Sequence, residues 1–113
     1  MARHNITGKI GEDLAADFLI RQGYEVITRN YRSGRGEIDI IATKDGVLVF
    51  IEVKVRKNIN FGFPEETVTP RKEEMILTTA ENYIFDTNWE GDIRFDILSI
   101  EKNNKILHFE DAF

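Results

Sequence analysis

The segment Val47–Arg56 constrains the fold more than any other part of this chain. Up to Glu52 its residues are apolar at odd and even positions alike, which is typical of a strand covered on both faces. Lys44-Asp45-Gly46 precedes it, and an Asp-Gly pair between two β-type segments is a strong hairpin signal. Glu37–Thr43 is therefore expected to be its partner strand. We predict a hairpin at the centre of a sheet, with other elements packed on both sides.

Helical and β-type segments surround this hairpin. Thr69-Pro70 is typical of a helix start, because Thr can accept a hydrogen bond from a free backbone N–H and Pro has no N–H to leave unsatisfied. Residues 57–68 are expected to be a loop. The other expected elements are a helix at residues 7–22, a strand at Tyr24–Tyr31, a helix from Thr69-Pro70 onward, and a closing hairpin of Asp92–Ile100 and Lys105–Phe109. This order predicts an α/β fold with a mixed central sheet flanked by helices, in a single domain over residues 1–113.

Charged side chains interrupt the apolar pattern of the central hairpin. Glu52 and Lys54 share one face of their strand with apolar residues, and Glu37 and Asp39 share a face of the partner strand. The other face of the partner strand is expected to carry Ile38, Ile40 and Ala42. Charges inside a sheet are costly unless they are paired or bound to a metal ion. These four charged side chains are therefore the first candidates for a functional site.

A two-residue turn at Asp45-Gly46 would fix the register of the hairpin. It places Asp39 opposite Glu52 and Glu37 opposite Lys54. Facing carboxylates repel each other, so this arrangement calls for a cation, and oxygen ligands favour Mg²⁺ or Mn²⁺. The pattern leaves two alternatives open. A bulged three-residue loop would shift the two acids to a diagonal, and the charges would otherwise form an ordinary cross-strand network in which Lys54 bridges both acids.

Composition narrows the chemistry that such a site can perform. The chain has no Cys and two His residues. Disulfides, thiolate ligands, Cys nucleophiles and iron–sulfur clusters are excluded, and so is a multi-histidine metal site. The longest apolar run, Val47–Ile51, is far too short to cross a membrane, and the first residues show no signal peptide. We expect a cytoplasmic protein without a membrane partner.

The distribution of charge is more informative than the formal net charge of −5. Residues 81–113 carry eight acidic and three basic side chains, whereas residues 1–80 carry twelve of each. Local clusters of bases set the field that a phosphate meets. The candidate nucleic-acid contacts are Arg32, Arg35, Arg56, Lys57, Arg71 and Lys72. Each of them taken alone is better explained as a solvated surface charge.

The hairpin resembles the signature of the PD-(D/E)xK nucleases. Gly36-Glu37-Ile38-Asp39-Ile40-Ile41-Ala42 supplies the Asp, and Glu52-Val53-Lys54 supplies the ExK on the next strand. Ile38 stands where the generic motif has Pro. Over about residues 6–100 the chain is similar to the YraN family, a widespread bacterial family of predicted endonucleases. Further segments that fit this family are Gly11-Glu12 with Ala15, Gly23-Tyr24, Asn30-Tyr31-Arg32, Phe61-Gly62-Phe63-Pro64 and Arg94-Phe95-Asp96.

This resemblance implies the restriction-endonuclease-like fold, which has an αβββαβ core. It also implies a Mg²⁺- or Mn²⁺-dependent endonuclease that hydrolyses phosphodiester bonds in DNA, with branched or damaged DNA as the candidate substrate. A divalent ion between carboxylates lowers the pKa of a bound water and offsets charge on the phosphate. Resolvases of the same superfamily pair two active sites, so a homodimer is a candidate assembly.

The resemblance assigns roles to residues of this chain. Asp39 and Glu52 would bind the metal ion, together with the carbonyl of Val53. Lys54 would orient or deprotonate the attacking water and stabilise charge on the phosphate. Archaeal Holliday-junction resolvases use a further glutamate from the first helix, and Glu12 matches that position. A glutamate at the rim of the helix, in contact with water alone, is the alternative for Glu12.

Two more carboxylates need an interpretation. Glu37 lies on the same strand face as Asp39. We expect it to hold neighbouring groups in place without binding the metal ion, either by pairing with Lys54 or by fixing the turn after Gly36. Asp96 lies in a later strand and is a rival to the two acids of the hairpin. For Asp96 we expect a structural role.

A second class of function also fits the sequence. A nuclease-like module that binds nucleic acid or a protein partner without cutting would keep the fold and lose the chemistry. Degenerate members of such families typically lose one of the three motif residues. Because Asp39, Glu52 and Lys54 are all present, the nuclease interpretation is favoured.

Overall fold

The computed structural model describes residues 3–56 and 68–113. The elements are α1 (Arg3–Arg21), β1 (Glu25–Ser33), β2 (Gly36–Lys44), β3 (Val47–Val55), α2 (Pro70–Thr87), β4 (Asp92–Ile100), the short 3₁₀ turn η2 (Lys102–Asn104) and β5 (Ile106–Phe109). This order confirms the predicted succession of helices and strands. Most of the predicted loop at residues 57–68, including Lys57 and Phe61-Gly62-Phe63-Pro64, lies outside the described residues.

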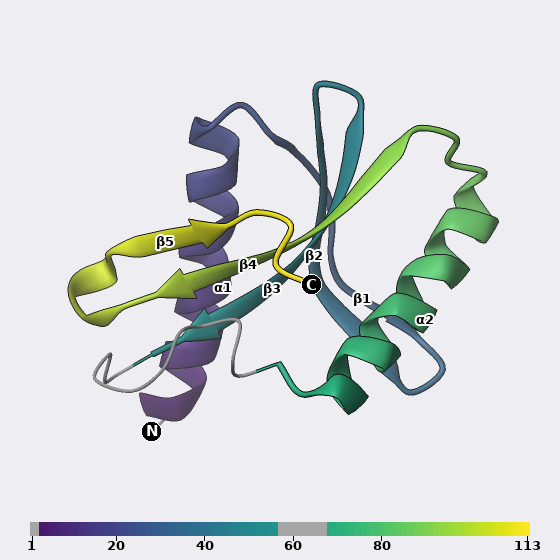
Figure 1. Ribbon diagram of the computed structural model, residues 1–113. Helices are drawn as coiled ribbons and strands as arrows, with labels where there is room; N and C mark the ends of the chain where they lie inside the picture. Colours follow the sequence, from purple (N-terminus) through teal and green to yellow (C-terminus); the bar gives the residue numbers. More distant parts are fainter. Residues whose placement is uncertain (1–2, 57–67) are drawn as a thin grey trace.

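The strands of the described residues form one mixed sheet in the order β1-β2-β3-β4-β5. Neighbours are antiparallel except for β3 and β4, which run parallel. A parallel pair needs a crossover connection, and α2 lies in it. Figure 1 shows α1 and α2 on opposite sides of the sheet. The protein therefore has the predicted α/β fold, and the element order is consistent with a restriction-endonuclease-like core.

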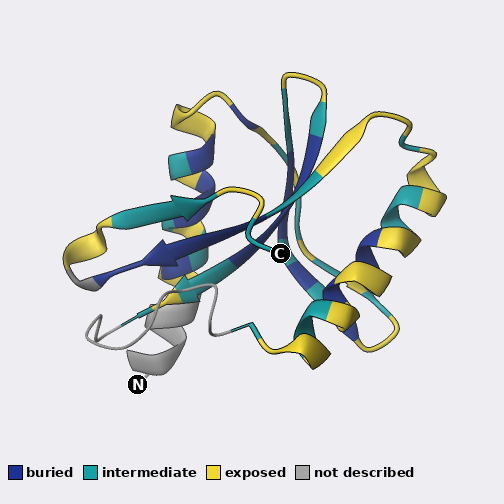
Figure 2. Ribbon diagram, in the orientation of Figure 1, coloured by how far each residue is buried: buried dark blue, intermediate teal, exposed yellow. Residues whose placement is uncertain are grey.

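The central strand β3 is buried on both faces, as the dark ribbon in Figure 2 shows. On the α1 side, Val49 and Ile51 belong to a core cluster with Leu19. On the α2 side, Phe50 belongs to a second cluster with Ile76. Full burial of such a side chain contributes about 1.5–3 kcal/mol. The two-sided cover predicted from the apolar pattern is confirmed.

The turn between β2 and β3 has the predicted geometry. Asp45 and Gly46 both have left-handed backbone conformations, with φ of 53° and 81°. This is the two-residue hairpin turn whose twist suits paired strands, and Asp-Gly adopts it at low cost. The turn makes Lys44 and Val47 a cross-strand pair. The predicted register of the hairpin is confirmed next to the turn.

Strand β2 is irregular at Asp39, and the predicted grouping of Ile38 with Ile40 is wrong. Ile38 packs on the α2 side together with Ile41, whereas Ile40 packs on the α1 side. Across from this point, Asn30 of β1 has a φ of 55°, and the β1–β2 pairing passes over both Asn30 and Asp39. The regular alternation of β2 side chains between the two faces of the sheet is therefore interrupted at Asp39.

The start of α2 fixes the basic side chains in its first turn. Thr69 caps the helix, because its Oγ1 accepts a hydrogen bond from the backbone N–H of Lys72 at 3.1 Å, and Pro70 is the first helical residue. Both features were predicted. In the part of the chain that the structure describes, no helix is long and apolar enough to cross a membrane.

Candidate functional site

Asp39 and Glu52 lie where the pairing of β2 with β3 ends. The ladder between the two strands stops at Ile40 and Ile51. Beyond it, the Asp39 side chain takes over the role of a strand partner, since its Oδ2 accepts a hydrogen bond from the backbone N–H of Val53 at 2.8 Å. The predicted register thus brings both acids to the same end of the hairpin, but not as a regular cross-strand pair.

The surroundings of Asp39 oppose its ionisation. Its pKa is raised to about 7, first by burial and second by the negative charge of Glu52. Glu12 and Glu37 act in the same direction, and the hydrogen bond from Val53 acts against them. Burial disfavours the charged form of a carboxyl, and the neighbouring carboxylates add to this effect. A cation bound at this place would stabilise the ionised form of Asp39.

Glu52 is the buried member of the pair, with 6% of its surface exposed. Its Oε2 lies 2.5 Å from Nζ of Lys72 and 3.5 Å from Nζ of Lys54. Lys54 follows on the same strand, whereas Lys72 comes from the first turn of α2. A buried carboxylate needs such partners, because an unpaired buried charge costs several kcal/mol. The site therefore combines two acids and two lysines from β2, β3 and α2.

The two lysines differ in how firmly they hold their protons. The pKa of Lys54 is lowered, first by burial and then by the positive charge of Lys72. Burial also acts to lower the pKa of Lys72, but the interactions with Glu52 outweigh it, and the net shift is upward. Lys72 is therefore the fixed positive charge of the site, and Lys54 is the lysine that gives up its proton more readily.

Sequence reasoning placed Lys72 among the phosphate contacts and missed its contact with Glu52. The available signal was Thr69-Pro70, which fixes the first turn of α2 and with it the position of Lys72. Which strand residue this turn faces depends on how α2 packs on the sheet. Local sequence does not encode that packing.

Glu37 lies beside the site but does not pair with Lys54. Its cross-strand partner is Arg32 of β1, and Oε2 of Glu37 lies 3.7 Å from Nε of Arg32. The predicted Glu37–Lys54 pair is not formed, because the β2–β3 ladder ends before it reaches these residues. Glu37 acts on the site through its charge, which contributes to the raised pKa of Asp39.

Glu12 reaches toward the same region from α1. Its Oε1 accepts a hydrogen bond from Nδ2 of Asn30 at 3.3 Å and lies 3.8 Å from Nη2 of Arg29. Its charge also contributes to the raised pKa of Asp39. Glu12 is therefore near the acid pair, while its role as a metal ligand stays a prediction.

The acid pair leaves oxygen atoms for a metal ion. Among the described residues, the hydrogen bond of Asp39 is made by its Oδ2 and the ion pairs of Glu52 by its Oε2, which leaves Oδ1 and Oε1 as candidate ligands. The Val53 carbonyl faces the same neighbouring strand as its N–H. In residues 3–56 and 68–113, no three His, Cys, Asp or Glu side chains are grouped to hold a metal ion. Mg²⁺ is commonly held by one or two carboxylates, with water and phosphate completing its shell. The donor set fits an open site of this kind.

The other candidate nucleic-acid contacts have different surroundings. Arg32 is paired with Glu37, and the backbone N–H of Arg56 donates to a carbonyl of β4. Arg35 and Arg71 line one cavity between the β1–β2 turn and α2. The structure thus brings two of the predicted bases together, outside the acid pair.

Asp96 has a fully satisfied carboxylate in the core. It is 0% exposed and accepts hydrogen bonds from Nε and Nη2 of Arg94 at 2.9 and 2.7 Å and from the backbone N–H of Asp111 at 2.9 Å. His108 Nε2 lies 2.7 Å from it, and Arg94 also donates to the hydroxyl of Tyr24. Burial acts to raise the pKa of Asp96, but the bonds from His108 and Arg94 outweigh it and lower the pKa. The geometry assigns Asp96 to this internal network.

Comparison with known proteins places the chain in a family. The sequence profile of the uncharacterised protein family UPF0102 matches residues 11–100. The UPF0102 protein of Flavobacterium psychrophilum is 43% identical over 116 residues, which cover 100% of this chain and 98% of that protein. The UPF0102 protein of Cytophaga hutchinsonii is 47% identical, over 96% of this chain and 96% of that protein. The UPF0102 protein of a Sulfurihydrogenibium species is 49% identical, over 94% of this chain and 92% of that protein.

Similarity to solved structures does not contribute to the family assignment. The structure of Pyrococcus furiosus SfsA in complex with Ca²⁺ covers 95% of this chain and 63% of its own, at 12% identity and a TM-score of 0.28. The sequence relatives carry the assignment by themselves, because they match over nearly the whole chain. The protein belongs to the uncharacterised protein family UPF0102, which is the YraN family that its sequence resembles.

Proposed function

We propose that this protein is a metal-dependent nuclease that hydrolyses phosphodiester bonds in DNA. The observation that carries the proposal is the crowded pair of Asp39 and Glu52, in which the pKa of Asp39 is raised to about 7, with Lys54 beside it. Two carboxylates that can hold a metal ion, next to an ammonium group, are the groups that this hydrolysis uses. The resemblance to PD-(D/E)xK nucleases supports the same assignment.

Asp39 and Glu52 would hold one Mg²⁺ or Mn²⁺ through Oδ1 and Oε1, with the Val53 carbonyl as a further ligand. Bound there, the ion would supply Lewis-acid chemistry, which lowers the pKa of water and offsets charge on the phosphate. The hydrogen bond from the Val53 N–H fixes the Asp39 carboxylate in the orientation that leaves Oδ1 available. Glu12 stays a candidate for an additional ligand.

The two lysines would divide the remaining work. Lys54 would act at the attacking water and at the phosphate, because its lowered pKa suits proton transfer and its charge suits an anion. Lys72 would hold Glu52 in place through its 2.5 Å contact with Oε2. In this arrangement Lys54 is a catalytic residue and Lys72 is a positioning residue.

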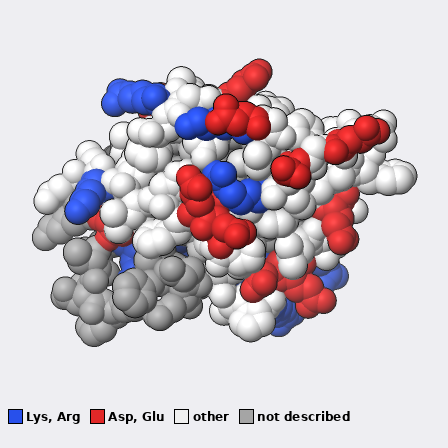
Figure 3. Space-filling view, turned by 45° about the horizontal axis from the view of Figure 1, so that its top comes forward, with Lys and Arg blue, Asp and Glu red and all other residues white. Residues whose placement is uncertain are grey.

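The charge distribution supports a limited contact with the substrate. Figure 3 shows acidic side chains spread over the face that it presents, with only isolated basic groups among them. The basic residues at the acid pair are Lys54 of β3 and Lys72 of α2, and Arg71 precedes Lys72 in the first turn of α2. A protein that contacts few phosphates gains modest affinity from counterion release. This favours DNA that is recognised by its structure, such as branched or damaged DNA, over tight binding along a regular duplex.

A cleavage assay tests the proposal. Single-stranded, duplex, flap and four-way DNA are incubated with the protein and Mg²⁺ or Mn²⁺, and with chelator as the blank. We expect cleavage of at least one substrate that requires the ion and is lost in Glu52→Gln. A folded Glu52→Gln protein that cuts as fast as the unchanged protein would show that the hairpin is not the active site.

A non-catalytic module is the second candidate function. The observation that favours it is the pairing of Glu52 with both Lys72 and Lys54, which compensates this acid without any metal ion. Such a module would bind DNA or a protein partner and cleave none of the four substrates. DNA binding that persists in chelator, with no cleavage under any condition, would support it over the nuclease.

A further inference from the structure

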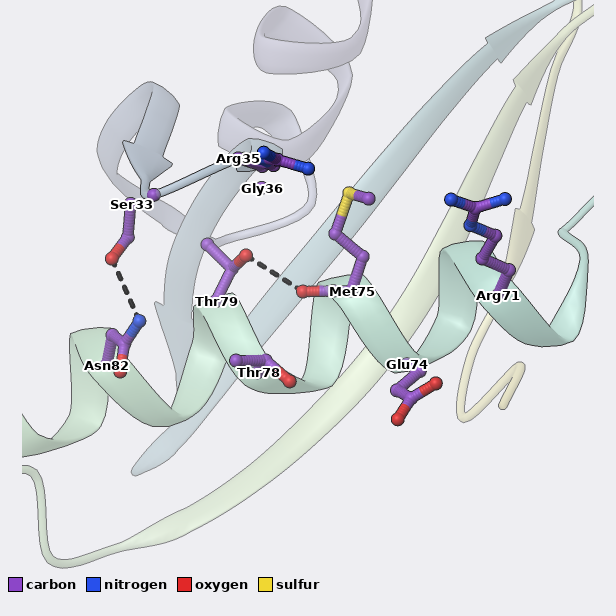
Figure 4. Close-up of a pocket in the computed structure, with 10 residues that line it drawn as sticks. Ser33, Arg35, Gly36, Arg71, Glu74, Met75, Thr78, Thr79 and Asn82 are labelled. Atoms are coloured by element: carbon purple, nitrogen blue, oxygen red, sulfur yellow. Dashed lines mark hydrogen bonds between the residues drawn. The ribbon is translucent and has the colours of Figure 1, made fainter.

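A cavity of about 370 Å³ lies between the β1–β2 turn and α2 (Figure 4). One wall is formed by residues 33–36 of the turn, and the other by side chains between residues 71 and 82 of the helix. Its volume is at the lower end of the range for ligand pockets. The cavity therefore suits a group of about the size of one nucleotide unit.

Two guanidinium groups border this cavity. Figure 4 shows Arg35 and Arg71 on the same side of α2, with the Met75 side chain between them and Glu74 pointing to the other side. Among the described residues, neither guanidinium has an ion-pair or hydrogen-bond partner, whereas Arg94 is paired with a carboxylate. Arginine pairs readily with phosphate through two parallel hydrogen bonds. Two uncompensated guanidinium groups on one small cavity favour an anionic ligand.

The walls of the cavity are held together without a ligand. Asn82 of α2 donates a hydrogen bond to the hydroxyl of Ser33 in the turn at 2.9 Å. Gly36 packs so closely on α2 that a Cβ at this position would overlap the side chain of Thr79. The hydroxyl of Thr79 is itself bonded to the carbonyl of Met75 at 2.8 Å. A site that is formed before binding spends little free energy on ordering its walls.

The cavity and the site around the acid pair share two elements, β2 and α2. Arg71 directly precedes Lys72, whose Nζ contacts Glu52, and Gly36 begins the strand that carries Asp39. A DNA strand with one phosphate at the acid pair can therefore place a neighbouring part of its backbone over the cavity. We propose that the cavity binds a backbone phosphate flanking the one that is cleaved, through Arg35 and Arg71. This inference rests on the proposed function and adds a substrate subsite to it.

Fluorescence anisotropy of a labelled single-stranded DNA, measured in chelator over a range of salt concentrations, tests the subsite. Arg35→Gln and Arg71→Gln are each expected to weaken binding and to lower the slope of log affinity against log salt. The double variant removes the whole contact and is expected to lower the slope by about 0.7, the value for one phosphate contact on a single strand. Glu74 lies one helical turn after Arg71, and Glu74→Gln removes its negative charge, so this variant is expected to tighten binding.

Lys105→Gln is the matched control, because Lys105 is exposed next to η2, away from α2. Arg35 and Arg71 are exposed and unpaired among the described residues, so their replacement should leave the circular dichroism spectrum and the melting temperature unchanged. Equal weakening by Lys105→Gln, unchanged binding by the double variant, or weaker binding by Glu74→Gln would each overturn the subsite. Thymidine monophosphate that binds as tightly as the DNA strand would overturn its assignment to a strand.

The outcome is separable from that of the nuclease proposal, because anisotropy in chelator involves no cleavage. The protein could bind DNA through Arg35 and Arg71 in this assay and cleave no substrate under any condition. This result would support the subsite and reject the nuclease. If the protein cuts, the double variant is expected to raise KM severalfold with little change in kcat. An unchanged KM would reject the subsite and leave the nuclease proposal standing.

Discussion

The ammonium group of Lys72 lies 2.5 Å from Oε2 of Glu52 and so joins the first turn of α2 to the centre of the sheet. The helix therefore covers one face of the core and also supplies a positive charge to the acid pair. Two consequences follow for Glu52. The contact fixes its orientation, and it makes Lys72 a competitor of any metal ion that binds there.

Replacing Lys72 separates these two effects. In chelator, Lys72→Met is expected to lower the free energy of unfolding by about 1–2 kcal/mol, because Glu52 loses its nearest partner. The loss is limited because the Lys72 side chain is partly exposed, so solvent already weakens the ion pair. The affinity for Mn²⁺ should rise, because the competing cation is gone. Thermal melts in chelator and calorimetric titration with Mn²⁺ measure the two quantities.

Lys72→Arg is the control, because it keeps the positive charge. It should retain the stability in chelator and the weaker Mn²⁺ affinity of the unchanged protein. If Lys72→Met lowers the Mn²⁺ affinity instead, the positioning of Glu52 by Lys72 outweighs any competition between Lys72 and the ion.

Lys54 is expected to behave differently from Lys72. Lys54→Ala should reduce cleavage on the order of 100-fold or more, because it removes the ammonium at the water and the phosphate. Its more distant contact with Glu52, at 3.5 Å, predicts that Mn²⁺ affinity changes little. Single-turnover cleavage rates and Mn²⁺ titration test this pair of effects. Parallel losses of activity and Mn²⁺ affinity would make Lys54 a counter-ion of the acids.

The elements of the fold were predictable because each depends on local sequence. Asp45-Gly46 specifies the hairpin turn and its register, and Thr69-Pro70 specifies the start of α2. The apolar run of β3 also predicts correctly that both faces of this strand are covered. The position of Ile38 was not predictable, because the irregularity at Asp39 involves the left-handed backbone of Asn30 on another strand.

The site was predictable only in part, because some of its contacts join elements that are far apart in the sequence. Asp39, Glu52 and Lys54 belong to two adjacent strands, and the hairpin register alone brings the acids to one end of the sheet. The contact of Lys72 with Glu52 depends on the packing of α2 over β3, which no local pattern specifies. The pairing of Glu37 with Arg32 depends likewise on where the β2–β3 ladder stops.

The network around Asp96 is expected to stabilise the protein without taking part in cleavage. Asp96→Asn removes the charge that pairs with Arg94, and we expect a loss of about 3–5 kcal/mol in the free energy of unfolding by urea. Glu110→Gln is the control, because Glu110 is 60% exposed and 3.7 Å from Arg94, and it should cost less than about 1 kcal/mol. An Asp96→Asn protein that is stable but inactive would place Asp96 in the active site.

Asp39 is expected to lower the stability of the protein at neutral pH when no metal ion is bound. Its pKa is about 7 in the folded protein and 3.8 when unperturbed, so the folded state binds the proton more tightly. The contribution of Asp39 is therefore neutral below about pH 4 and becomes increasingly destabilising as the pH rises to about 7. At about 1.4 kcal/mol per pKa unit, the total is on the order of a few kcal/mol.

Asp39→Asn should remove this pH dependence. The amide oxygen can still accept the hydrogen bond from Val53, so the variant is expected to be more stable than the unchanged protein in chelator at pH 7, with the difference vanishing near pH 4. For a dissociation constant of ~1 mM, ~10 mM Mg²⁺ should stabilise the unchanged protein by about 1.4 kcal/mol and leave Asp39→Asn unaffected. Thermal melts at both pH values measure this. A network in which Lys54 bridges both acids predicts the reverse, a less stable Asp39→Asn and no effect of Mg²⁺ on either protein.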